Sequence, residues 1–308
     1  MSTLLNVLLP IFGLILLGYL CRRTRRLGDS AASELNRFVV WLGLPALLFT
    51  LTATADWAQI WQPGFLLAFS AGTFAVFGLS LLWRLRTRAS LSDASLDALS
   101  ASYGNTGYLG IPLCVLVLGQ AGLAPALIAS LIVVCALFGL SVVLVEVGLQ
   151  REQRLWPATR KVLVALLKNP LVVAPLLGGL WSASGLPLPG AARQLLDMLG
   201  AATVPCALVS LGAFLAQRSM AISLDALWLV LMKLVLAPLI TWLLAVVWLK
   251  IPTFWAHAAL LLSALPTGTG PYMLAEHYSR EAGRVSQTIL WSTLGSLLSL
   301  SAILLLIR

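Results

Sequence analysis

Two short clusters of glycine, proline, asparagine and threonine interrupt strongly apolar stretches of this sequence. The first is Gly104-Asn105-Thr106-Gly107 and the second is Pro266-Thr267-Gly268-Thr269-Gly270-Pro271. Glycine and proline interrupt the hydrogen-bond ladder of a helix and leave backbone N–H and C=O groups without partners. In apolar surroundings each such group costs several kcal/mol, so the two breaks must line a cavity or meet each other.

A site of this kind suits an anion. The half-helix that starts at a break presents free N–H groups and the positive end of its dipole, which favours a carboxylate. Simple kinking of packed helices is the alternative, but two clusters with embedded polar side chains favour a site. The predicted substrate-binding residues are Asn105, Thr106, Gly107, Pro112, Pro266, Thr267, Gly268, Thr269, Gly270 and Pro271. We predict no catalytic residue, no metal ligand and no cofactor.

The composition places these clusters in a membrane protein. Of the 308 residues, 60% are hydrophobic and 10% are charged, with a mean hydropathy of +0.96. Soluble domains carry about 25% charged residues, so most of this surface must face lipid. The net charge of +9 comes from basic residues between apolar segments, which indicates membrane topology rather than nucleic-acid binding.

We predict an all-α fold with ten membrane spans, since a crossing helix needs about 20 mostly apolar residues. Five spans lie in a first half, residues 1–148, and five in a second half, residues 169–308, joined by a short cytoplasmic linker at 149–168. The predicted spans are 4–20, 33–52, 63–83, 95–118, 124–147, 169–186, 195–216, 224–248, 256–278 and 285–306.

Lysine and arginine residues predict the orientation. Fourteen lie in the loops after spans 1, 3, 5, 7 and 9, whereas the opposite side holds Arg193, Lys250 and Arg308. Positive loops stay in the cytoplasm, so both termini are predicted on the outer face of the cell inner membrane.

Five spans per half is an odd number, so a duplicated half would insert upside down. At a shift of 160 residues Pro10 falls on Pro170 and Pro45 on Pro205, and the two breaker clusters match at nearly the same shift. Interrupted spans at matching positions of inverted repeats are typical of transporter binding sites. We therefore predict two inverted five-helix repeats with broken spans 4 and 9.

Several motifs resemble those of the auxin efflux carrier family, and the similarity covers nearly the whole chain. They are the fourth-span stretch 104–113, the ninth-span stretch 264–272 with Ala275 and Tyr278, Asn36-Arg37-Phe38-Val39, and Lys168-Asn169-Pro170 with Gly178 and Trp181-Ser182. The resemblance implies a fold related to bile-acid sodium symporters. Spans 4 and 9 would cross in a mobile domain that moves like an elevator. Spans 1, 2, 6 and 7 would form a scaffold, with a homodimer through helices 2 and 7. The short central loop is typical of prokaryotic members.

Charged residues inside the spans raise further hypotheses. Glu276 lies in the second half of span 9, where it either couples transport to protons or sits at the cytoplasmic interface. Lys233 lies deep in span 8, where it either attracts an anion or pairs with a neighbour, and it is the second candidate for proton or ion coupling. Asp93 and Asp97 begin span 4, where carboxylates favour a helix N-terminus.

These patterns favour a secondary transporter of a small organic anion. An enzyme is disfavoured because the sequence has two histidines, His257 and His277, and neither an HExxH nor a GxSxG motif. A channel or receptor-like protein is the other alternative, but paired broken helices favour alternating access. The two clusters contain no arginine, which favours an auxin-like monocarboxylate over a dicarboxylate such as malate or malonate.

Overall fold

A computed structural model describes residues 2–54, 62–149, 164, 167–168, 170–218, 221 and 223–307. Across these ranges the chain is helical, and an isolated bridge between Gly104 and Thr267 accounts for its extended backbone pairing. The predicted linker at 149–168 lies almost entirely outside the described residues, as does Arg308.

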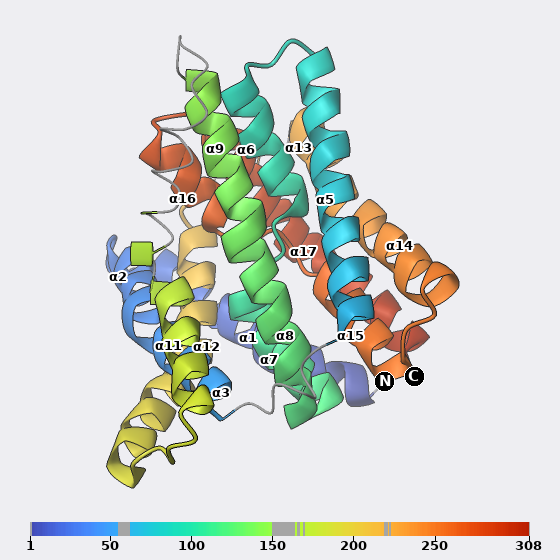
Figure 1. The fold of residues 1–308 in the computed structure, drawn as a ribbon. Helices are drawn as coiled ribbons and strands as arrows, with labels where there is room; N and C mark the ends of the chain where they lie inside the picture. Colours follow the sequence, from blue (N-terminus) through green and yellow to red (C-terminus); the bar gives the residue numbers. More distant parts are fainter. Residues whose placement is uncertain are drawn as a thin grey trace.

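The helices in chain order are α1 (Ser2–Arg23), α2 (Ala31–Phe38), α3 (Leu44–Ala53), α5 (Pro63–Arg86), α6 (Leu91–Ser102), α7 (Ile111–Leu118), α8 (Leu123–Leu131), α9 (Phe138–Leu149), α11 (Pro170–Ala183), α12 (Gly190–Leu215), α13 (Leu224–Leu231), α14 (Ala237–Trp242), α15 (Thr253–Ser263), α16 (Gly270–His277) and α17 (Gly283–Leu306). Turns of π-helix join α2 to α3, α8 to α9 and α13 to α14. Figure 1 shows their arrangement.

Six continuous helical stretches in the described ranges are long and apolar enough to cross a membrane. They are Ala31–Ala53, Pro63–Arg86, Gln120–Leu149, Gly190–Leu215, Leu224–Trp248 and Gly283–Leu306. Shorter apolar helices cover Thr106–Leu118, Val172–Ala183 and Thr253–Ser263. Large apolar side chains such as Leu180 and Leu298 are 69% and 79% exposed, as expected of a surface that lipid covers.

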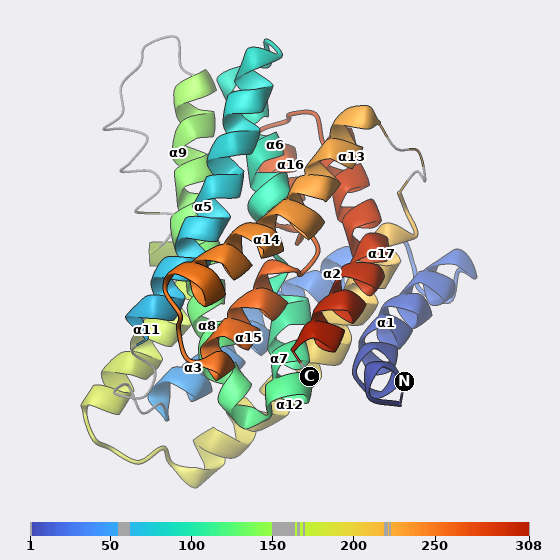
Figure 2. The same cartoon turned by 90° about the vertical axis from the view of Figure 1, so that its right-hand side faces the viewer.

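The helices pack as two groups. In the first helix group, α1 and α2–α3 pack against α12, and α11 packs against α3. The second helix group contains α5 to α9 and α13 to α17, with α6 packed against α5, α9 and α17. Close approach within the first group depends on glycine: a Cβ at Gly212 would lie 1.9 Å from the Ile15 carbonyl oxygen of α1. The start of α1 and the end of α17 lie at the same end of the bundle (Figures 1 and 2).

The prediction for the start of span 4 holds for one aspartate and is wrong for the other. Ser90 caps α6 by accepting a hydrogen bond from the Asp93 N–H at 3.2 Å, and Asp93 lies in the first turn. Asp97 lies beyond that turn, with 3% of its side chain exposed. Its carboxylate contacts Arg84 at 2.7 Å and Arg284 at 2.9 Å, so Asp97 balances buried charge rather than a helix dipole.

Candidate functional site

The two breaks meet in the middle of the second helix group. Between α6 and α7, and again between α15 and α16, the chain leaves the helix and the two extended segments run antiparallel past each other. Two backbone hydrogen bonds flank the bridge: Asn105 N–H to Pro266 C=O at 2.8 Å, and Gly268 N–H to Tyr103 C=O at 3.0 Å. Each break therefore satisfies part of the backbone that the other one frees, which lowers the cost of both inside an apolar bundle.

Asn105 occupies a special place at this crossing. Its side chain is 5% exposed, and its Oδ1 accepts a hydrogen bond from the Tyr108 N–H at 3.3 Å, so it caps the helical turn that follows. An amide that uses its oxygen as the cap leaves its NH₂ as the remaining donor. That nitrogen, Nδ2, is buried without a partner in the described part of the chain. A buried donor without a partner is costly.

A cavity of about 160 Å³ lies beside Asn105, between the two helix groups. Val40, Leu44 and Leu48 of the first group form one wall. The predicted residues in the opposite wall are Asn105, Thr106, Gly107, Gly268, Thr269 and Gly270. The cavity is smaller than the roughly 300–1,000 Å³ of sites for drug-sized ligands, so it suits a small molecule held by a few polar groups.

Four predicted residues lie outside this wall. Pro112 and Pro271 are buried near the starts of α7 and α16, and Pro266 contributes its carbonyl to the crossing. Thr267 is fully buried and donates its hydroxyl to the Ser100 carbonyl at 2.8 Å, so its visible contacts hold the crossing together.

Lys233 lies behind the crossing. Its side chain is 2% exposed, and Nζ donates to the Ser263 carbonyl at 2.6 Å, at the C-terminal end of α15. A cation at the last carbonyls of a helix is favoured by the helix dipole. A Cβ at Gly104 would lie 3.7 Å from this Nζ, which shows how closely the lysine underlies the first break.

Glu276 occupies a different environment. It is exposed on α16, next to His277, and does not line the cavity. The start of α6 and the loop after α16 are joined nearby by Arg280, whose guanidinium contacts both carboxylate oxygens of Asp93. Burial raises the pKa of Asp93, but hydrogen bonds from Arg280 and Ser90 outweigh it and hold that pKa below its ordinary value.

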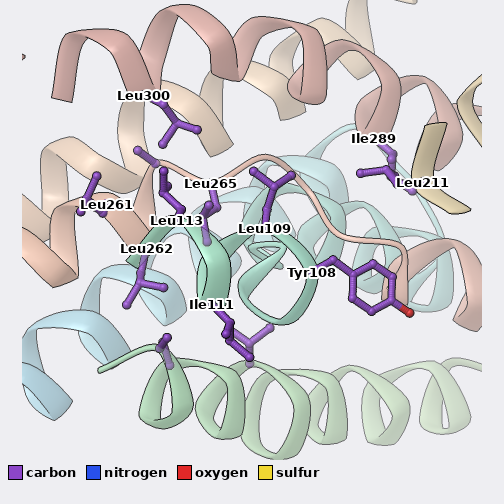
Figure 3. Close-up of a cluster of buried hydrophobic side chains, with 14 of the residues drawn as sticks. Tyr108, Leu109, Ile111, Leu113, Leu211, Leu261, Leu262, Leu265, Ile289 and Leu300 are labelled. Atoms are coloured by element: carbon purple, nitrogen blue, oxygen red, sulfur yellow. The ribbon is translucent and has the colours of Figure 1, made fainter. Parts of the chain in front are cut away.

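Residues absent from the predicted set complete the cavity, above all Tyr103, Tyr108 and Phe138. Tyr108 also donates its hydroxyl to Asn36 Oδ1 on α2, which joins the crossing to the first helix group. Figure 3 shows Tyr108 at the edge of a leucine cluster that contains Leu109, Leu113 and Leu265. Tyr108 and Asn36 both lie inside motifs that the sequence singles out, but no spacing rule indicates that they touch.

Comparisons with known proteins place the chain among membrane transporters. The family described as "Membrane transport protein" matches residues 3–304. A protein of Rhizobium meliloti named "Putative malonate transporter" is 30% identical over 312 residues, covering 100% of this chain and 97% of the relative. An "Uncharacterized transporter" of Methanothermobacter thermautotrophicus is 28% identical over 301 residues, covering 96% and 95%. "Uncharacterized transporter YfdV" of Escherichia coli is 26% identical over 242 residues, covering 75% of each chain.

Proposed function

Because this chain belongs to the membrane transport protein family, which includes the auxin efflux carriers, and is a transporter rather than an enzyme, we propose that it carries a small organic anion across the bilayer by alternating access. The cavity at the crossing is the proposed substrate site.

The free Nδ2 group of Asn105 carries this proposal. It is a buried donor whose side chain is held in place by its own capping bond, and Asn105 lines a small cavity together with apolar residues and the glycine-rich breaks. A carboxylate would satisfy that donor and would lie near the N-terminal end of α16, which begins at Gly270 in the cavity wall. Thr106 and Thr269 supply hydroxyl groups in the same wall.

We propose that the chain spans the membrane ten times as two inverted repeats in the inner membrane, with both termini outside. The bounds of the helices support the repeat. Adding about 160 to the stretch Ala31–Ala53 gives Gly190–Leu215, and adding it to Pro63–Arg86 gives Leu224–Trp248. The broken pair α6–α7 corresponds in the same way to α15–α16.

Alternating access requires two bodies that move relative to each other. We propose that the first helix group is a fixed scaffold and that the second moves like an elevator, carrying the crossing. The cavity lies between these groups, where a shift of one against the other would expose it to either side in turn. In this scheme the scaffold pairs with a second copy through the second and seventh spans, α2–α3 and α12.

The substrate class we favour is a carboxylate of malonate size. The small volume of the cavity favours it over an indole acid, and the name of the Rhizobium meliloti relative agrees. An auxin-like monocarboxylate is the second candidate, because the two breaker clusters supply no arginine.

Uptake of labelled malonate and indole-3-acetate into proteoliposomes tests the proposal. Asn105→Asp keeps an oxygen that can cap the following turn but replaces the free donor with a repelling oxygen, so saturable uptake should fall below detection. Asn105→Ala should weaken it by roughly 10- to 100-fold, the worth of a hydrogen bond to a charged group.

Gln120→Ala is the matched control, because it removes an exposed amide that does not line the cavity. It should leave uptake unchanged. Folded protein that shows no saturable flux of either anion, or equal flux in wild type and Asn105→Asp, would overturn the proposed site.

A further inference from the structure

A second cavity adjoins the proposed substrate site. Its volume is about 310 Å³, and it lies between α2, α12 and α16. The two cavities share Tyr108, Thr269 and Met273 in their walls. The two cavities are therefore neighbours, with these three residues between them.

Arg218 is the cation in the wall of this second cavity. Its guanidinium carbon lies 4.3 Å from the ring centre of Phe214 and 4.3 Å from that of Tyr272. Phe214 belongs to α12 and Tyr272 to α16, so the arginine bridges the two helix groups. Aromatic faces hold a guanidinium in place without using its N–H donors.

Part of the donor set of Arg218 is in use, because its side chain hydrogen-bonds that of Tyr272. The Arg218 Nε is buried and has no hydrogen-bond partner in the described part of the chain, and within the same ranges no carboxylate forms an ion pair with it. The two nearby acids interact with other side chains. Asp29, also in this wall, forms an ion pair with Arg22, and Glu276 accepts a hydrogen bond from the Tyr272 hydroxyl. A partly buried guanidinium with an unused Nε–H can donate a charge-assisted hydrogen bond to a carboxylate.

A third, wider hollow leads to this place from the surface. Arg22, Arg23 and Arg25 line it, and it shares Asp29 and Gln217 with the second cavity. The three hollows thus form a row from an arginine-rich surface, past Arg218, to Asn105. Positive charge along a cleft raises the local concentration of anions and their rate of entry.

We propose that Arg218 forms a second carboxylate-binding site, which captures the substrate from the arginine-rich face before it passes Thr269 to the crossing, and which selects dicarboxylates over monocarboxylates. This inference rests on the proposed function. The selectivity follows from charge, because the attraction of one guanidinium for a dianion is about twice that for a monoanion at the same distance.

The test compares uptake of malonate with uptake of monomethyl malonate, which keeps the carbon chain but carries one carboxylate. Arg218→Gln should raise the KM for malonate by about 10-fold, the worth of one charge-assisted hydrogen bond. For the monoester the same substitution should raise KM by roughly 3-fold, since half the charge is involved.

Two further variants complete the test. Arg193→Gln removes an exposed arginine at the other end of α12, paired loosely with Asp197 at 3.9 Å, and should leave both KM values unchanged. Arg218→Lys keeps the charge but loses the planar fork, so an intermediate KM for malonate is expected. Arg218→Lys also tests the proposal if the Arg218→Gln protein fails to fold.

The outcomes separate the two proposals. Saturable malonate uptake that collapses in Asn105→Asp but keeps its wild-type KM in both Arg218 variants would overturn the capture site alone. An equal rise in KM for malonate and for monomethyl malonate would overturn the selectivity and with it this inference. No saturable uptake of either anion by the folded wild-type protein would overturn the proposed function and this inference together.

Discussion

Replacing Asp97 by asparagine should destabilise the second helix group strongly. Asp97 Oδ2 contacts Arg84 Nε at 2.7 Å and Arg284 Nη1 at 2.9 Å, with 3%, 9% and 25% of the three side chains exposed. The asparagine keeps the size of the side chain but removes its charge. Two guanidinium groups then share a single acid, Asp225, which contacts both and is 39% exposed.

The size of the effect follows from this geometry. Removing one partner of a buried ion pair costs about 3–5 kcal/mol, because the remaining charge stays buried without compensation. Asp225 still compensates part of that charge, so we expect the lower end, about 3 kcal/mol, or roughly a 100-fold shift toward unfolded protein. Thermal unfolding in detergent, followed by tryptophan fluorescence, measures the loss.

A matched control is available on α12. Asp197→Asn breaks a pair in which both side chains are about 60% exposed, and such pairs contribute at most about 1 kcal/mol. The double variant Arg84→Met with Asp97→Asn should lose less than the sum of the two single losses, since each removes the other's partner. If the Asp97→Asn and Asp197→Asn proteins unfolded at the same temperature, the idea that Asp97 compensates buried charge would be refuted.

Three other substitutions address the interfaces between elements. Tyr108→Phe removes the hydroxyl that binds Asn36 across the two helix groups, so malonate exchange should speed up by roughly 2- to 10-fold, and an unchanged rate would show that this bond does not restrain the movement. The lowered pKa of Asp93 means that its carboxylate stabilises the fold above the ordinary value of 3.8 and that this contribution is lost as pH falls through the folded-state pKa. Asp93→Asn should therefore melt below wild type near neutral pH, with the gap closing below about pH 4, whereas a constant gap would argue against the Arg280 pair as its cause. Gly212→Ala should cost about 1–3 kcal/mol in thermal unfolding, because its Cβ would lie 1.9 Å from the α1 backbone, and an unchanged melting temperature would mean that the two helices separate easily.

Features set by local sequence were predictable. The span predicted at 224–248 corresponds to the helical stretch Leu224–Trp248, because Ser223 supplies an N-cap at its start and an apolar run follows. The two breaks were visible for the same reason: clustered glycine and proline weaken helix formation whatever surrounds them. The helix at the predicted span 4 begins at Leu91, before the predicted start at 95, since Ser90 caps it one turn earlier.

Pairings between distant spans were not predictable. In the sequence, Arg84 and Arg284 lie in predicted loops. In the fold both contact Asp97, which is 13 residues from Arg84 and 187 from Arg284 along the chain. The hydrogen bond between Tyr108 and Asn36 crosses 72 residues. Contacts of this kind depend on how helices rotate and tilt against one another, and a single sequence carries no periodic signal for that.

The expected substrate class also depends on contacts between distant parts of the chain. The absence of arginine from the breaker clusters favoured a monocarboxylate only on the assumption that those clusters supply every charge the substrate meets. Arg218 follows α12, and in the sequence it is one of the basic loop residues that predict the membrane orientation, in the loop after span 7. In the fold it lines a cavity that shares Thr269 with the crossing, between the rings of Phe214 and Tyr272. Arg218 thus lies one cavity away from Asn105 and outside both motifs. Under the proposed capture role, a substitution of this arginine would change the preference between mono- and dicarboxylates while leaving the crossing itself unaltered.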